Sequence, residues 1–111
     1  MAATAAFLAD FYTGIENILK RISRCYGIPM PTGDDWHTEL FNRFCDPAFG
    51  NLPVVFNDEQ KKLLAAYRRF RHVIHHGYAM QLDWERMAEG VGGVQAAYAG
   101  FKARLCELFG V

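Results

Sequence analysis

Residues 57–78 read NDEQKKLLAAYRRFRHVIHHGY, and this stretch carries the clearest fold signal in the chain. Its apolar side chains recur at steps of three and four, which is the spacing of a helix that buries one face. They are Leu63, Leu64, Tyr67, Phe70, Val73 and Ile74. Asn57 and Gln60 stand at the two positions of a capping box, and Gly77 is a typical helix stop. The sequence therefore predicts a helix from Asn57 to about His76.

Two further helices are predicted before this one. Residues 3–25 carry apolar side chains at helical spacing, and Gly27 and Pro29 then end the pattern. The expected buried stripe of this helix is Phe7, Phe11, Ile15, Ile18 and Ile22. The second helix is expected to start near Thr32, which with the acids after it resembles a capping box, and to end before Pro47. Its expected apolar face is Trp36, Leu40, Phe41 and Phe44.

A last helix is predicted after residues 57–78, from Asp83 to about Phe109. Its expected apolar face is Trp84, Met87, Val91, Val94, Tyr98, Phe101, Leu105 and Leu108. Four glycines weaken it, each by about 1 kcal/mol relative to alanine in a helix interior. They are Gly90, Gly92, Gly93 and Gly100. These glycines either break the helix around Gly92 and Gly93 or allow another helix to approach closely.

Length and composition fit one folded domain. The chain has 111 residues, of which 51% are hydrophobic, and 12 lysines and arginines balance 12 acidic residues. This composition excludes a disordered chain, and the net charge of zero excludes a bulk polycation that coats nucleic acid. Four helices joined by short or moderate loops predict an all-α antiparallel four-helix bundle that spans residues 1–111 as a single domain.

The cysteines and the hydropathy pattern indicate the compartment. Cys25, Cys45 and Cys106 are odd in number and widely spaced, which favours reduced thiols over a disulfide framework. No apolar run reaches the ~18 residues of a membrane span. The first residues lack the basic region of a signal peptide. We therefore expect a cytoplasmic protein that does not associate with membranes.

Positive charge gathers in residues 57–78, where five lysines and arginines face two acids. The last eight of these residues bring together an arginine, three histidines and a tyrosine: Arg71, His72, His75, His76 and Tyr78. An arginine binds phosphate oxygens through its planar fork, and a histidine exchanges a proton near neutral pH. These are the groups that cleavage of a phosphodiester requires in the absence of a metal.

Helical spacing limits which of these side chains meet. Arg71 and His75 are four residues apart and share a face, as do His72 and His76. Arg71 and His76 are five apart, about 140° around a regular helix. They converge if the helix frays at Gly77 or if a second subunit completes the site.

Other interpretations of these residues stay open. Lysines and arginines on an outer helix face are often merely solvated. His72 and His76 have the spacing of zinc ligands, but no cysteine or adjacent glutamate accompanies them. At least one of the three histidines is expected to be a core residue, and Tyr78 suits a position that covers the end of the bundle. His37, which follows Trp36, is assigned to packing and capping rather than to catalysis.

The spacing Arg71-x4-His76-x-Tyr78 matches the R-x4-H-x-Y motif of HEPN-domain ribonucleases. The chain resembles the HepT-type toxins of that superfamily over nearly its whole length. The resemblance extends to residues 15–22, 35–37, 70–72 and 82–86. It implies a HEPN-type helical bundle that dimerises, so that two motifs face each other across a shared cleft.

The resemblance also implies an activity and a partner. HepT-like proteins are toxins that act as RNA endonucleases without a metal or another cofactor. On this model Arg71 and His76 are the catalytic residues, and His72, His75 and Tyr78 support them. The partner is a minimal nucleotidyltransferase antitoxin that can silence the toxin by adding AMP to the motif tyrosine, here Tyr78. The alternatives are a catalytically silent HEPN module that binds a nucleotidyltransferase, and a metal-binding helical bundle.

Overall fold

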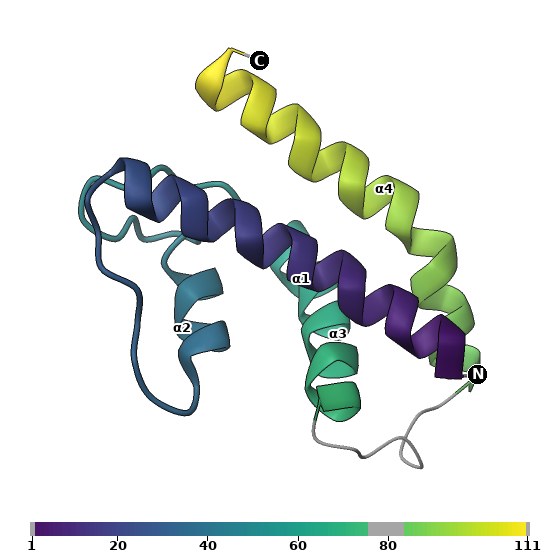
Figure 1. Ribbon diagram of the computed structural model, residues 1–111. Coiled ribbons are helices and arrows are strands. Elements are labelled where there is room, and N and C mark those ends of the chain that lie inside the picture. The colour runs from purple at the N-terminus through teal and green to yellow at the C-terminus, as the bar shows by residue number, and fades with distance from the viewer. Residues whose placement is uncertain (1, 76–83, 111) are drawn as a thin grey trace.

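The structure is a computed structural model that describes residues 2–75 and 84–110. It contains four helices, labelled in Figure 1: α1 (Ala2–Cys25), α2 (Trp36–Asn42), α3 (Asp58–His75) and α4 (Trp84–Phe109). α1 contacts each of the other three helices, and its contact with α3 is the largest. The described part of the chain has no β-strand, apart from an isolated bridge between Cys45 and Phe56. The prediction of an all-α helical bundle is confirmed.

The buried face of α1 differs from the expected one. The residues that it contributes to the core cluster are Leu8, Tyr12, Ile15, Leu19 and Ile22. Phe7 and Ile18, which belonged to the expected stripe, are 51% and 38% exposed. At 100° per residue the two stripes are offset by roughly 60°, because apolar residues fill both phases of this helix. The sequence thus predicted the helix correctly and its orientation only in part.

The second helix is shorter than predicted. It begins at Trp36 rather than near Thr32, and Asp35 precedes it without making a side-chain cap hydrogen bond. Gly33 has a φ of +112°, which a right-handed helix does not accept, so the predicted capping box at Thr32 is wrong. Phe44 and Cys45, which follow α2, are still buried in the core. The carbonyl of Phe44 accepts hydrogen bonds from the backbone N–H groups of Val55 and Phe56, which hold this segment against the one that precedes α3.

The third helix begins as predicted. The N–H of Gln60 donates to Asn57 Oδ1 at 2.8 Å, and the N–H of Asn57 donates to Gln60 Oε1 at 3.0 Å. These two bonds form a reciprocal capping box. The helix then runs to His75, and the expected end at about His76 lies outside the described residues. Leu64 and Tyr67 are buried, whereas Leu63, which was expected on the buried face, is 38% exposed.

The last helix is continuous from Trp84 to Phe109, so the expected break around Gly92 and Gly93 is not found. The other interpretation of its glycines is correct for two of them. A Cβ atom added at Gly93 would lie 3.0 Å from Tyr67 Oη, and one at Gly100 would lie 3.1 Å from Gln60 Nε2. Both glycines therefore let α4 lie close to α3.

Part of the apolar face expected for α4 is exposed in the structure. Ala97 and Phe101 are buried, but Val91 and Tyr98, which were expected inside, are exposed.

None of the described helices carries an apolar stretch that could cross a membrane. The three cysteines are free thiols.

Candidate functional site

Arg71 projects from α3 toward α1. Its Nε donates a hydrogen bond to Thr13 Oγ1 at 3.2 Å and lies 3.0 Å from Glu16 Oε1. Its side chain is 16% exposed, so the guanidinium is largely removed from solvent but still reaches the surface. The motif arginine is therefore an anchored group and not a freely solvated surface cation.

Glu16 is the buried charge in this contact, with a residue exposure of 1%. Its Oε1 faces Arg71, and its Oε2 lies 2.6 Å from Nδ1 of His37 on α2. A buried carboxylate is costly unless it is paired and hydrogen-bonded. Glu16 meets that condition with one partner on each of two other helices, so its carboxylate joins α1, α2 and α3.

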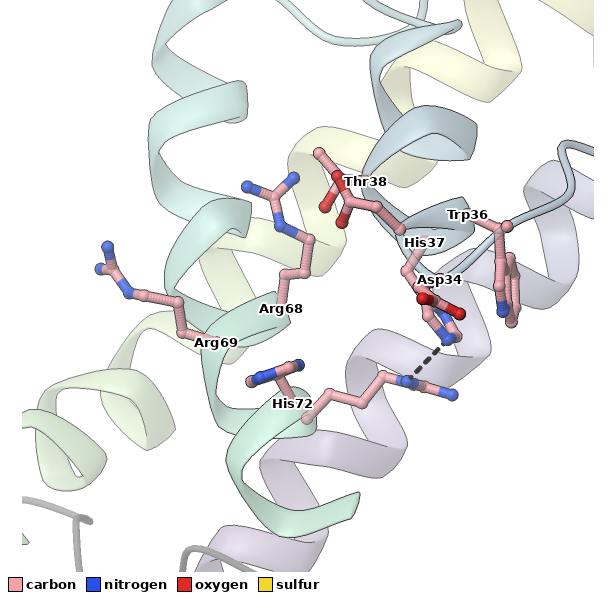
Figure 2. Close-up of a pocket in the computed structure, with 10 residues that line it drawn as sticks. Asp34, Trp36, His37, Thr38, Arg68, Arg69 and His72 are labelled. Carbon is pink, nitrogen blue, oxygen red and sulfur yellow. Dashed lines mark hydrogen bonds between the residues drawn. The ribbon is translucent and has the colours of Figure 1, made fainter. Parts of the chain in front are cut away.

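His37 completes the network. Its Nδ1 donates to Glu16, and its Nε2 accepts a hydrogen bond from Arg71 Nη1 at 3.2 Å. The dashed line at His37 in Figure 2 marks the second of these bonds. This pattern assigns the proton of a neutral imidazole to Nδ1. Burial lowers the pKa of His37 below its usual value. Glu16 acts in the opposite direction on that pKa, while the charges of Arg71 and Lys20 lower it further.

Trp36 covers one side of this imidazole. The two ring centroids are 3.4 Å apart, and the rings are tilted by 33°. Lys20 Nζ lies 4.7 Å from the centroid of the Trp36 ring, on the α1 side of the network. His37 is thus surrounded by one carboxylate, two cations and an aromatic ring.

An open cavity of about 660 Å³ lies in front of this network. Residues 33–38 line one wall, and the other wall is formed by α3 through Arg68, Arg69, Arg71 and His72. Figure 2 shows His72 and Arg68 on the α3 side and His37 and Thr38 on the α2 side. The volume lies within the range of small-ligand sites and is sufficient for a nucleotide. The α3 wall is strongly basic, and Asp34 and Asp35 lie on the opposite wall.

The residues predicted for the site fall into three groups. Arg71 and His72 both line the cavity, so the structure brings these two together. His75 is the last residue of α3. His76 and Tyr78 lie outside the described residues, and the predictions made for them stay predictions.

Two residues of the network had no predicted place in the site. His37 was assigned to packing and capping; its ring packs against Trp36 and also bonds to Glu16 and Arg71. Glu16 was given no role, because the stripe expected for α1 centres on another face; in the structure it lies four residues after the buried Tyr12 and three before the buried Leu19. A carboxylate in that position has to find a buried partner.

The zinc alternative gains no support from the described part of the chain. No group of three histidine, cysteine or acidic side chains within residues 2–75 and 84–110 is placed to hold a metal ion. His76, one of the two residues with zinc-ligand spacing, lies outside those ranges.

Comparison with known proteins gave two matches. A family model described as HepT-like protein matches residues 3–109. The chloroplastic/mitochondrial asparagine–tRNA ligase of Arabidopsis thaliana is 31% identical over 108 residues, which is 96% of this chain and 19% of the ligase. The chain thus spans about a fifth of the length of that relative. No solved structure matched the chain.

Proposed function

Because the chain belongs to the HepT-like protein family, we propose that it is a toxin-type RNA endonuclease whose cavity at Arg71 holds the scissile phosphate. One observation carries this proposal: the motif arginine is fixed at the edge of a cavity of nucleotide size and is accompanied there by Arg68 and Arg69. A basic wall of this kind attracts a polyanion even though the whole chain is neutral.

The guanidinium suits the charge that develops during cleavage. A phosphodiester under attack gains negative charge on its non-bridging oxygens, and a fixed N–H donor stabilises that charge more than it stabilises the ground state. Arg71 is held by contacts to Nε and Nη1, so its position is set before RNA binds. Preorganisation of this kind is the usual source of large electrostatic rate effects.

The reaction is a transfer within the RNA strand. The ribose 2′-oxygen attacks the adjacent phosphorus, the bond from phosphorus to the 5′-oxygen breaks, and a 2′,3′-cyclic phosphate and a 5′-hydroxyl result. One group removes the proton of the 2′-hydroxyl, and another gives a proton to the leaving oxygen. His76 is proposed as the general base or acid, with His72 or His75 as the second group.

A homodimer would remove the constraint that the five-residue spacing between Arg71 and His76 places on a single copy. Arg71 and His76 are about 140° apart around a regular helix, so one copy does not easily direct both at the same phosphate. Two copies that face each other would offer two arginines and two sets of histidines to one RNA strand. We therefore propose that the active form is a dimer with the motifs at the shared cleft.

The proposed partner is a minimal nucleotidyltransferase that acts as the antitoxin in the cytoplasm. In its reaction the Tyr78 hydroxyl oxygen attacks the α-phosphorus of ATP, pyrophosphate leaves, and the hydroxyl proton passes to solvent. The product is a phosphodiester that carries negative charge beside the motif. It would compete with RNA phosphate for the arginines, by the same charge effect as phosphorylation.

Cleavage of RNA by the purified chain tests the proposal. A tRNA pool is the first substrate to use, since the plant relative is named as a tRNA ligase. Wild type should cleave with EDTA present and leave 2′,3′-cyclic phosphate ends, whereas Arg71→Ala and His76→Ala should not. Glu39→Gln on α2 is the control, because Glu39 pairs with Arg43 outside the cavity. Absence of cleavage across pH, together with binding of the nucleotidyltransferase, would instead identify a silent interaction module.

A further inference from the structure

We propose that Glu16 and His37 are positioning residues that aim the Arg71 guanidinium into the cavity, and that the unprotonated imidazole of His37 is the form that holds it there. This inference rests on the proposed function, in which Arg71 binds the scissile phosphate. It adds α2 to a site that the motif alone would place on α3. It also gives the site a dependence on pH that does not arise from the motif histidines.

The contacts fix the guanidinium at two of its nitrogens. Nε is held by Glu16 Oε1 at 3.0 Å and Thr13 Oγ1 at 3.2 Å, and Nη1 donates to His37 Nε2 at 3.2 Å. Because the group is rigid and planar, contacts to two different nitrogens set its direction as well as its place. Nη2 takes part in none of these three contacts, so together with Nη1 it can present a two-pronged donor to phosphate oxygens.

Glu16 also determines which ring nitrogen of His37 carries the proton. Its Oε2 accepts the Nδ1 proton at 2.6 Å, which leaves the lone pair of Nε2 to accept from Arg71. One nearly inaccessible carboxylate therefore orients both the arginine and the imidazole. This is the arrangement by which a carboxylate selects the tautomer of a functional histidine in other enzymes.

A second proton on His37 would break the arrangement. It would occupy Nε2, the atom that accepts from Arg71 Nη1, and two cations would then face each other. The charged groups around the imidazole are Glu16 and Lys20 from α1 and Arg71 from α3. Burial lowers the pKa of His37, which keeps the accepting form in place near neutral pH.

A role limited to stability makes different predictions. A network that merely joins three helices would change the unfolding temperature when it is cut, but it would leave the pH profile of the folded enzyme unchanged. A positioning role acts on the transition state, so it lowers kcat more than it raises KM. A positioning role also predicts that kcat is restored by a side chain at position 37 that keeps a hydrogen-bond acceptor, whereas a role limited to stability does not.

The test compares His37→Phe with His37→Gln, because glutamine offers an oxygen acceptor and phenylalanine does not. We expect His37→Phe to lower kcat by at least about tenfold and to raise KM by a smaller factor, since misplacing a catalytic group by an ångström is costly. His37→Gln should keep kcat within about threefold of wild type and show a shallower acid-side fall in kcat than wild type, because only the proposed motif histidines then titrate there. Glu39→Gln on the same helix is the matched control. Circular dichroism confirms that each variant is folded.

Three results would overturn the proposal: wild-type kcat in His37→Phe, equal losses of kcat in both variants, or an acid-side fall in His37→Gln that is as steep as that of wild type. If His37→Phe does not fold, the pH profile of His37→Gln decides on its own.

Binding of an RNA oligonucleotide with 2′-O-methyl groups separates this inference from the proposed activity, because that probe lacks the attacking hydroxyl. Weaker binding by His37→Phe, with no cleavage by wild type, would support positioning and reject the nuclease. Normal cleavage and binding by His37→Phe would reject positioning and keep the nuclease. As a further check, ¹⁵N NMR should show His37 protonated at Nδ1 in wild type at neutral pH, and a ring protonated at Nε2 would contradict the proposal.

Discussion

The carboxylate of Glu16 on α1 contacts Arg71 on α3 through one oxygen and His37 on α2 through the other, at 3.0 and 2.6 Å. Glu16 is the member of this network that solvent reaches least. The three groups therefore form one hydrogen-bonded network, and each can be substituted separately.

Replacing Glu16 with alanine should destabilise the fold by about 3 kcal/mol or more, because it leaves a largely buried arginine without its carboxylate partner. Urea unfolding followed by circular dichroism measures the change. The comparison is Glu39→Ala, which removes an exposed partner of Arg43 and should cost no more than about 1 kcal/mol. Equal losses in the two variants would show that the buried network contributes little.

Stability should fall as the pH drops below about 6.5, the usual pKa of an unfolded histidine. Burial lowers the pKa of His37 in the folded state, so between the two pKa values the unfolded chain binds a proton that the folded chain does not. The contribution of His37 to the free energy of unfolding is complete above about pH 6.5 and is lost as the pH falls toward the pKa of His37 in the folded state.

Melting temperatures of wild type and His37→Gln from pH 8 to pH 5 check this expectation. The other titrating groups are common to both proteins, so they largely cancel in the difference. The wild type should lose stability relative to the variant as the pH falls. A constant difference across the range would contradict the assigned direction of the pKa shift.

Arg71→Lys should reduce cleavage by about 100-fold or more, although the charge is kept. A lysine ammonium is a point charge that cannot engage Glu16, His37 and a two-pronged phosphate contact together. Single-turnover cleavage of RNA measures the chemical step. Lys102→Ala, an exposed cation on α4 outside the cavity, should cleave as wild type does. Full activity of Arg71→Lys would mean that the planar fork is not required.

Gly92→Ala and Gly93→Ala should change stability in different directions. A Cβ at Gly92 meets nothing within 4 Å, so alanine should stabilise α4 by up to about 1 kcal/mol. At Gly93 the added carbon would lie 3.0 Å from Tyr67 Oη, which donates to the carbonyl of Gly90 at 2.7 Å. Displacing that hydroxyl should cancel the gain or produce a net loss. Thermal unfolding of the two variants gives the answer, and an equal gain in both would contradict the close approach of α4 to α3.

Local signals made much of the fold predictable. The capping box at Asn57 and Gln60 needs only neighbouring residues, and the structure contains it. The similar pattern at Thr32 failed because the positive φ of Gly33 delays the start of α2. The orientation of α1 was harder to predict, since apolar residues such as Phe7 and Ile18 extend its stripe beyond the face that the other helices cover.

Part of the candidate site comes from one segment that the sequence singles out. Arg71 opens the motif and His72 follows it, and both line the cavity. His37 and Glu16 come from two other segments, and their roles depend on contacts between helices that no local pattern encodes. The stripe expected for α1 lies on another face from Glu16, so the burial of this carboxylate, and with it the need for a partner, follows only from the structure.

The brevity of α2 has a consequence for how the site is assembled. This helix has seven residues and starts without a side-chain cap, while α1 and α3 are long and share the largest contact in the fold. Local opening of α2 is therefore cheaper than separation of α1 from α3, and its amide hydrogens should exchange earliest among those in the helices that form the site. Each opening takes His37 away while Glu16 and Arg71 stay paired. Hydrogen exchange of α2 should therefore report how often the site lacks its imidazole.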